Sequence, residues 1–557
     1  MWLLRAYLIS TMYIDTSTVH GKYTRHLLRT SYRENGDSKH RTIVNLSHCP
    51  DDVIAAFKLA LRHKDNLAEL IAIDESISLH QGRSFGAVWT IHQVAKELGI
   101  VQALGNGRDG KLAMLQIIAR VLEQGSRLSA VRLANRHALR EILDLNSFNE
   151  DDLYANLDWL AENQAKIENR LFALNPSPDK GLYLYDVTSS YLEGTQNELS
   201  AFGYNRDKKK GKRQIVIGLL CDSDGKPLSV EVFSGNTQDT QTVSHQIDKL
   251  SKRFGGVPIT LVGDRGMIKA PQIDELASFG MHYITAITKP QIKTLLSNGT
   301  IQMTMFDQAM TEVITDEGTR YVVRRNPVRA AQLQSVRTDK LASLQRFVDS
   351  RNKYLADHSR AQVEVAVRKI TSKSVRLVIS DWLMVHADGR QLSLQVNLEQ
   401  LQEAEKFDGC YVIKTDLTPE QASKEVVHDR YKDLSQVEWA FRTCKTTNLE
   451  VRPVFVRRAD RTRGHVFVVM LSYLVVWALS RRWWDVELTL EESLDHLAGI
   501  EMVEVRANGR PCCNKIMVPD ELGTRLLEKA KVILPEITPA IRGPVATRKA
   551  MRKRRAS

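Results

Sequence analysis

Cysteines are scarce in this sequence, and no apolar run is long enough to cross a membrane. Among 557 residues there are six cysteines, and only Cys512 and Cys513 stand close together. This spacing excludes a paired zinc site and a disulfide framework, and favours a reducing cytoplasm. The longest apolar run, Val466–Ser480, falls short of the roughly 18 residues that a spanning helix needs. We therefore expect a buried core helix there, and no membrane partner.

The N-terminus also lacks the features of a secretory signal. Met1–Ser10 is apolar, but it has neither a basic leader nor a cleavage site of small residues. Met12 is an alternative start of the chain. The sequence thus favours a cytoplasmic protein.

Acidic residues are outnumbered by basic ones, which points to a polyanionic partner. The 78 Lys and Arg against 66 Asp and Glu give a net charge of +12 and a pI near 9.2. Nucleic acid is the leading candidate for that partner, and a mildly basic soluble enzyme is the alternative. Because 43% of the residues are hydrophobic, the chain can fold, and its length allows several modules.

The pattern of apolar residues divides the chain into parts of different character. A turn at Glu34–Asp37 indicates a small hairpin, and three-to-four spacing of apolar residues predicts helices over Asp51–Leu174. The predicted parts are a hairpin-like module (1–50), a helical region that could bind DNA (51–175), the first part of an α/β core (176–289), a β-rich insertion (290–406), the second part of the core (407–485), and a helical C-terminal region with a basic tail (486–557).

One segment of the helical region has the pattern of a helix-turn-helix. Trp89–Leu98 is predicted to be a helix, Gly99 a turn and Ile100–Leu104 the start of a second helix. An ordinary antiparallel helix pair has the same pattern, so DNA recognition by this segment stays one of two interpretations.

Two apolar strands each end on an aspartate. Gly181–Asp186 is the first, Pro258–Asp264 is the second, and two strands and a helix are predicted between them. Either aspartate alone could cap a helix or a turn. Two carboxylates on adjacent strands repel each other unless a hard cation such as Mg²⁺ lies between them. Together they predict a metal site.

A third carboxylate lies in a segment without proline or glycine, Tyr431–Lys445, which is predicted to be one helix. Leu434, Glu438, Arg442 and Lys445 fall on the same helical face as Tyr431. The alternative is an amphipathic helix with a solvated stripe, in which Glu438 and Arg442 form an ordinary ion pair.

These three sites, in this order, resemble those of bacterial insertion-sequence transposases of the DDE class. In the group named after insertion sequence four, the third carboxylate follows a signature of Tyr, two residues, Arg, three residues, Glu, six residues, Lys. Tyr431, Glu438 and Lys445 match that spacing, whereas Leu434 stands at the Arg position. Arg430 and Arg442 are possible substitutes for that Arg. The text around Asp186-Val-Thr-Ser-Ser, Val262-Gly-Asp-Arg-Gly-Met, Arg452-Pro-Val and Gly464-His465 is also similar, so the resemblance covers Gly181–Ser480.

The resemblance implies a fold, a reaction and a set of residues. The fold would be α/β, with a ribonuclease H-like mixed sheet, a β-rich insertion and a mainly helical N-terminal region. Asp186, Asp264 and Glu438 would be catalytic residues and ligands of two Mg²⁺ ions, which Mn²⁺ can replace. Tyr431, Lys445 and Arg442 would bind DNA. The partners would be double-stranded terminal inverted repeats, target DNA and a second copy of the chain, at the nucleoid.

The interval from Asp264 to Glu438 spans 438 − 264 = 174 residues, which predicts an insertion in the core. Alternating residues predict strands in the insertion, a helix is predicted around Ala330–His358, and Gly409–Thr415 is predicted to return to the core. The predicted strands are Thr300–Met305, Arg320–Arg325, Val363–Ile370, Val375–Val385 and Leu392–Val396. Two alternatives to a transposase stay open, a nuclease of the same fold and a non-catalytic DNA-binding descendant.

Overall fold

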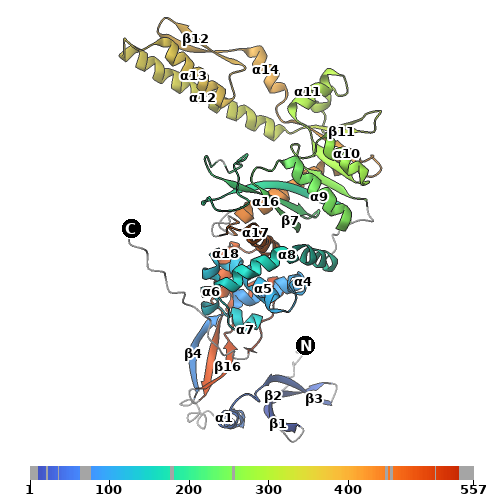
Figure 1. Ribbon diagram of the computed structural model, residues 1–557, viewed down its shortest axis with the longest axis vertical. Coiled ribbons are helices and arrows are strands. Elements are labelled where there is room, and N and C mark those ends of the chain that lie inside the picture. The colour runs from blue at the N-terminus through green and yellow to red at the C-terminus, as the bar shows by residue number, and fades with distance from the viewer. Residues whose placement is uncertain are drawn as a thin grey trace, which may run out of the picture.

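The computed structural model describes residues 11–19, 23–34, 37–62, 77–175, 181–207, 209–253, 258–445, 449–451, 456–507 and 510–538. The molecule is elongated, with a helical arm at one end and a small β module at the other (Figure 1). A large sheet lies between them, with helices layered beneath it. The predicted basic tail, Arg548–Arg555, lies outside the described residues.

The large sheet has eight strands in the order β10-β11-β14-β9-β8-β5-β6-β7. β5, β6 and β7 form the predicted antiparallel meander, while β8 and β9 run parallel to β5. These five strands have the third-second-first-fourth-fifth order of a ribonuclease H-like sheet, so the predicted fold class is confirmed. The strands are β5 Leu182–Tyr191, β6 Gln214–Cys221, β7 Pro227–Ser234, β8 Thr260–Gly263, β9 His282–Ala286, β10 Thr311–Ile314, β11 Arg320–Arg325 and β14 Cys410–Thr415.

The two faces of β5 contact different helices, because successive side chains of a strand point to opposite faces. Tyr183 and Tyr185 belong to the core that includes α9 (Asp239–Arg253) and α10 (Ala270–Ser278). Leu182 and Leu184 belong to the core that includes α16 (Leu434–Lys445) and α17 (Ala459–Arg482). By this alternation Asp186 falls on the α16 face.

The predicted core helix at Val466–Ser480 is confirmed as part of α17. In the described part of the chain it is the helix long and apolar enough to cross a membrane, but it is buried inside the protein. α17 packs against α5 (Arg108–Leu122), α8 (Glu150–Leu174) and β7. Residues from both halves of the chain therefore share one core.

The insertion contains more helix than was predicted. α12 (Pro327–Asp357) and α13 (Val363–Leu377) form the arm with the hairpin β12 (Leu383–Asp388) and β13 (Gln391–Val396), while α11 (Lys289–Ser297) precedes it and α14 (Leu398–Lys406) follows it. The strand predicted over Val363–Ile370 is wrong: Ala366, Ile370 and Ser374 are buried at helical spacing. The strand predicted over Thr300–Met305 is also wrong, since a 3-10 helix occupies Met303–Asp307.

The C-terminal region is not mainly helical as predicted. It has the helices α18 (Leu490–Ala498) and α19 (Glu521–Ala530), but β15 (Glu501–Ala507) and β16 (Arg510–Ile516) lie between them. Together with the short β17 (Ile537–Thr538), they form a sheet with β4 (Ile77–Ser84), far away in the sequence. Local periodicity did not indicate this pairing, because the partner strand lies in the N-terminal region.

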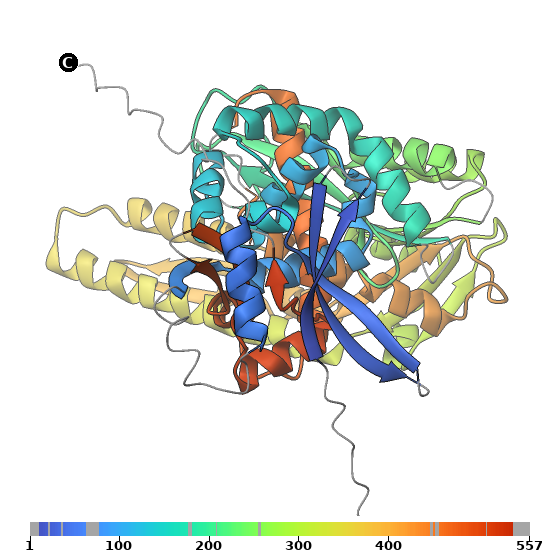
Figure 2. The ribbon, with the colours of Figure 1, turned by 90° about the horizontal axis from the view of Figure 1, so that it is seen from below.

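The N-terminal parts contain the predicted hairpin and helices, but the stretch predicted to be helical from Asp51 also contains the strand β4. β1 (Thr11–Val19), β2 (Tyr23–Glu34) and β3 (Asp37–Asn45) form a small sheet beside α1 (Asp51–Arg62), near the lower end of the molecule (Figures 1 and 2). The helical region also contains α3 (Gly86–Glu97), α4 (Ile100–Leu104), α6 (Arg127–Arg136) and α7 (Leu139–Leu143).

The predicted helix pair is present at α3 and α4. Gly99 joins the two helices with φ +76°, a left-handed conformation that favours glycine. α4 has only five residues, of which Ile100, Ala103 and Leu104 are buried. Little of it faces solvent for a DNA groove.

Candidate active site

Two aspartates lie at the same level of neighbouring parallel strands, Asp186 within β5 and Asp264 directly after β8. The pairing of β5 with β8 ends at Tyr185 and Gly263, so the next residues are Asp186 and Asp264. β8 ends there, as predicted, but β5 continues to Tyr191 because its antiparallel pairing with β6 holds it in the sheet. The two strands therefore diverge where the carboxylates lie.

Glu438 approaches the two aspartates from the α16 side of the sheet. The segment predicted as one helix is two, because α15 (Lys424–Lys432) ends at Asp433 and α16 begins at Leu434. The amide of Asp433 still donates to the carbonyl of Asp429, and that of Gln436 donates to the carbonyl of Asp433, so hydrogen bonding continues across the junction of the two helices.

The three carboxylates line one cleft of about 340 Å³. Asp186 is half-buried, whereas Asp264 and Glu438 are exposed. Burial, together with the negative charges of Asp264 and Glu438, raises the pKa of Asp186 to about 7, against the opposing effect of Arg206. A carboxyl in this setting needs either a proton or a cation beside it.

Tyr431 also lines the cleft and contacts Asp264. Its hydroxyl donates to Oδ1 of Asp264 over 3.1 Å, and the same oxygen accepts the amide of Arg265 over 2.8 Å. Burial and the charge of Asp264 raise the pKa of Tyr431, so this side chain acts as a neutral donor. It can therefore hold the Asp264 carboxylate in one orientation.

The remaining residues of the signature lie in different places. Leu434 is buried and lines the cleft. Arg442 is exposed on α16, and the part of the chain that the structure describes gives it no ion pair with Glu438. Lys445 lies outside the cleft lining, where its Nζ binds Oδ1 of Asp207 over 2.8 Å.

Four other residues line the cleft without having been predicted: Asn326, Tyr411, Lys432 and Ser435. Asn326 caps α12 by accepting the amide of Arg329, and the Tyr411 hydroxyl lies 2.6 Å from Nε2 of His428 on α15. Lys432 directly follows Tyr431 in the sequence, a proximity that could have indicated it. Asn326 and Tyr411 reach the cleft through the sheet pairing of β11 with β14, which local sequence does not reveal.

The donor set suits a hard divalent cation, since three carboxylates line one cleft and the pKa of Asp186 is raised there by burial and by the charges of Asp264 and Glu438. Within the described residues, no three acidic, His or Cys side chains converge closely enough to chelate one ion. The residues of the cleft therefore fit a divalent cation by their negative charge and their oxygen ligands.

Comparisons with known proteins agree with this arrangement. The family model described as "Transposase DDE domain" matches residues 177–475, more than half of the chain, and this range contains all three carboxylates. The chain belongs to the DDE transposases. A second model, "IS1634 family transposase, N-terminal domain", matches residues 14–72. The protein is thus an insertion-sequence transposase of the IS1634 type, an enzyme that cleaves DNA and transfers strands.

Two further comparisons concern curated proteins and solved structures. No curated protein matches this transposase. Among solved structures it is similar to one entitled "Cryo-EM structure of piggyBac transposase synaptic complex with hairpin DNA (SNHP)", with 9% identity, a TM-score of 0.31, and coverage of 70% of this chain and 78% of that one. DDE transposases act on DNA and generally use divalent metal ions.

Proposed function

We propose that this transposase moves its element by cut-and-paste, with Asp186, Asp264 and Glu438 as its catalytic carboxylates. One observation carries the assignment: two aspartates lie at one level of adjacent parallel strands and share a cleft with a glutamate from α16. This arrangement brings hard oxygen ligands from three elements to one cleft.

The same three residues are the proposed ligands of two Mg²⁺ ions, which Mn²⁺ can replace. When bound, such ions activate the attacking oxygen and stabilise the leaving one. The chain contributes the negative charge that attracts them, since three carboxylates line the cleft. Burial, together with the charges of Asp264 and Glu438, disfavours the Asp186 anion, so a cation beside it would be stabilising. Tyr431 contributes orientation, by donating its hydroxyl to Asp264.

The proposed DNA ligands are Tyr431, Arg442 and Lys445, with Lys432 added from the cleft lining. Arg442 is exposed one turn beyond Glu438, where a phosphate beside the cleft can reach it. Lys445 would exchange its ion pair with Asp207 for a phosphate, or would stay as a structural contact. Double-stranded terminal inverted repeats and target DNA are the proposed substrates.

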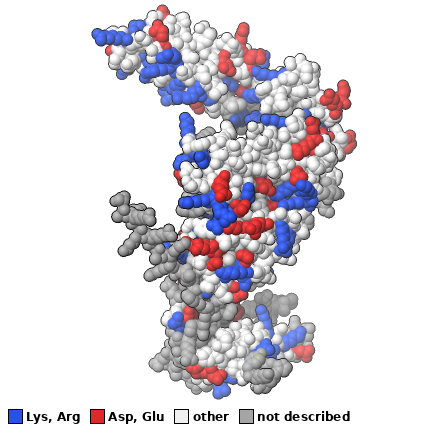
Figure 3. Space-filling view, in the orientation of Figure 1, with Lys and Arg blue, Asp and Glu red and all other residues white. Residues whose placement is uncertain are grey.

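The arm offers a second basic surface for DNA. Lysines and arginines gather over it in the space-filling view (Figure 3). Its two long helices carry Arg329, Arg337, Lys340, Arg346, Arg351, Lys353, Arg368, Lys369, Lys373 and Arg376. Such a surface neutralises phosphates without reading sequence.

The active assembly is proposed to be a homodimer, because both ends of one element must be held together while they are cut. In the proposed division of the chain, 51–175 contributes to DNA binding, 176–289 and 407–485 belong to the core, and 290–406 is inserted between them, although β10 and β11 of that insertion extend the core sheet. The enzyme would act at the nucleoid, in the cytoplasm of a bacterium.

The test is metal-dependent cleavage and joining of a labelled duplex that carries the terminal repeat. The intact protein is compared with Asp264→Asn, and with the control Asp274→Asn, an exposed aspartate on α10 outside the cleft. We expect cleavage and joining with Mg²⁺, their loss in the Asp264 variant and their retention in the control.

Other outcomes would identify the alternatives. Cleavage without joining indicates a nuclease of the same fold, and binding without cleavage by the intact protein indicates a non-catalytic descendant. Equal activity of the Asp264 variant and the intact protein would refute the proposed site.

A further inference from the structure

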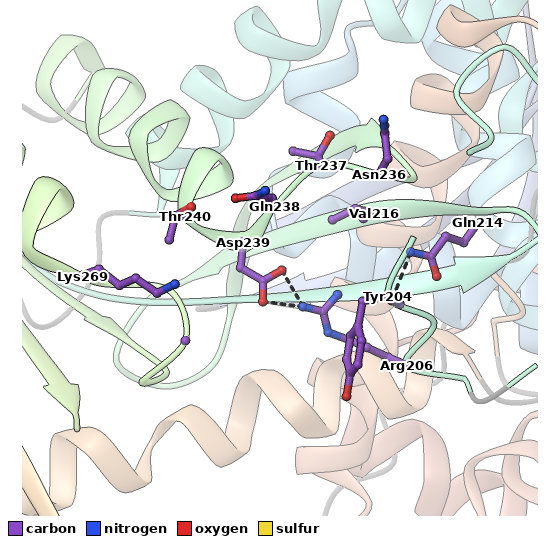
Figure 4. A pocket seen from close by; sticks show the side chains of 11 residues that line it. Tyr204, Arg206, Gln214, Val216, Asn236, Thr237, Gln238, Asp239, Thr240 and Lys269 are labelled. Carbon is purple, nitrogen blue, oxygen red and sulfur yellow. Dashed lines mark hydrogen bonds and ion pairs between the residues drawn. The ribbon is translucent and has the colours of Figure 1, made fainter. Parts of the chain in front are cut away.

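A second cleft, of about 310 Å³, lies next to the catalytic one. Its walls are the connection from β5 to β6, the start of α9 and the loop that follows β8 (Figure 4). Gly266 of its lining comes two residues after Asp264, and the amide of Arg206 donates to Oγ of Ser189 on β5 over 3.0 Å. A DNA strand in the catalytic cleft would thus pass beside this one.

The floor of the second cleft contains an unsatisfied acceptor. Gln214 is only 1% exposed, and its Nε2 donates to the carbonyl oxygens of Tyr204, over 3.1 Å, and Gly235, over 2.8 Å. Since both partners can only accept, the orientation of the amide is fixed. Its Oε1 is buried and accepts no hydrogen bond from the described residues. A buried acceptor of this kind costs free energy until a donor reaches it.

The backbone around Gln214 is packed so closely that this arrangement is built into the fold. A Cβ on Gly235 would lie 1.9 Å from the carbonyl oxygen of Gln214, and one on Gly203 would lie 2.1 Å from that of Gly235. Both positions therefore require glycine. The connection from β5 to β6 packs against the start of β6, where the backbones of Ala201 and Gln214 exchange two hydrogen bonds.

The walls of the second cleft carry an exposed ring and two cations. Tyr204 is 82% exposed, and the Arg206 guanidinium lies 5.8 Å from the centroid of its ring. Arg206 is held by Asp239, with one nitrogen 2.6 Å from each carboxylate oxygen. Lys269 lies on the opposite wall of the cleft from Tyr204 (Figure 4). An open aromatic face next to positive charge is typical of single-strand binding sites.

We propose that the second cleft binds one unpaired base of the DNA substrate, an inference that rests on the proposed function. The Oε1 of Gln214 would accept an N–H of the base edge, the ring of Tyr204 would stack on the base, and Lys269 would lie near its phosphate. A phosphate alone fits less well, because the buried oxygen of Gln214 repels an oxyanion.

The test compares two single-stranded probes of equal length and charge. One is a short fluorescent oligodeoxythymidine, whose bases carry an N–H donor, and the other is its abasic counterpart. Binding of the full chain is followed by anisotropy in a chelator, so that no cleavage occurs. Tyr204→Ala is compared with Phe202→Ala, since Phe202 is a 63% exposed ring in the same loop that does not line the cleft.

We expect the intact protein to prefer the probe with bases, and Tyr204→Ala to lower that preference by roughly 5- to 150-fold, the range for loss of one base–aromatic stack. Phe202→Ala should keep the preference, and Tyr204→Phe should restore it. No preference in the intact protein, or equal losses in the two alanine variants, would overturn the proposal. A protein that fails to cleave its terminal repeats would still give this ratio, so the failure of the proposed function is distinguishable.

Discussion

Replacing Glu168 with Gln should destabilise the protein, because this carboxylate joins the helical N-terminal region to the catalytic sheet. Glu168 of α8 is 3% exposed, and one of its oxygens binds Arg253 of α9 over 2.6 Å and Lys249 over 3.2 Å. The same side chain accepts the hydroxyl of Ser229 over 3.0 Å and the amide of Val230 over 3.3 Å. Four donors from the core thus converge on one side chain.

The size of the effect follows from what the substitution leaves behind. Breaking a buried ion pair by removing one partner costs about 3 to 5 kcal/mol. Lys249 keeps a second partner in Glu231, over 2.6 Å, and the Arg253 side chain is 17% exposed, so water can reach part of its guanidinium. We therefore expect Glu168→Gln to lower the free energy of unfolding by about 2 to 4 kcal/mol.

The assay is urea unfolding followed by tryptophan fluorescence, with Glu162→Gln as the control, since Glu162 is an exposed residue of the same helix. The double variant Glu168→Gln with Arg253→Gln should cost less than the sum of the two single variants, because the partners are coupled. A loss below about 1 kcal/mol for Glu168→Gln, or additive losses in the double variant, would refute the reasoning.

Three further predictions concern the active site and its support. Tyr431→Phe should slow cleavage by about 3- to 30-fold in a single-turnover assay, with little change in melting temperature, because one hydrogen bond to a charged acceptor, Asp264, is lost; an unchanged rate would contradict the orienting role. Lys445→Ala should reduce the slope of log binding constant against log salt concentration by about one phosphate contact, because the proposed contact of Lys445 with DNA phosphate is lost. An unchanged slope would mean that Lys445 serves only its ion pair with Asp207. Burial and two arginines hold the pKa of His465 well below 6.5, so stability should fall as pH drops below about 6.5, where the unfolded histidine gains a proton that the folded one excludes; pH-dependent melting of the intact protein against His465→Asn measures it, and equal slopes would count against it.

The tautomer behind the last prediction is set by the neighbours of His465. Arg127 can only donate, and its Nη2 lies 2.9 Å from Nδ1 of His465, so Nδ1 accepts. Nε2 therefore carries the proton and donates to the carbonyl of Val451 over 3.2 Å. In a protonated imidazole Nδ1 would also carry a proton, and this N–H would face the N–H of the Arg127 guanidinium. Protonation of His465 therefore opposes folding.

The parts of the site that could be predicted are those encoded in short runs of residues. Asp186 and Asp264 follow apolar strands, and Glu438 lies in a helix with a recognisable spacing, so each element was visible locally. Tyr431 remains close to that helix even though Asp433 divides it. The parts that could not be predicted depend on pairing at a distance, as with Asn326, which directly follows β11, and Tyr411 on β14.

The wrong predictions have the same physical origin. Val363–Ile370 is rich in β-branched residues, and its local preference favours a strand, yet packing of Ala366 and Ile370 in the arm makes it a helix. The strand at Glu501–Ala507 was assigned to a helical region because its partner, Ile77–Ser84, is more than 400 residues earlier. Tertiary contacts decided both segments.

The joining of the two ends of the chain has a consequence for its synthesis. While the ribosome is still translating, the helices α5 and α8 present an apolar face that α17 covers only after residue 482 has emerged. The strand β4 likewise has no pairing with β15 until Glu501–Ala507 has been synthesised. A nascent chain therefore exposes the apolar faces of α5 and α8 until α17 has emerged, and a chain that ended before α17 would lack the cover of these N-terminal helices.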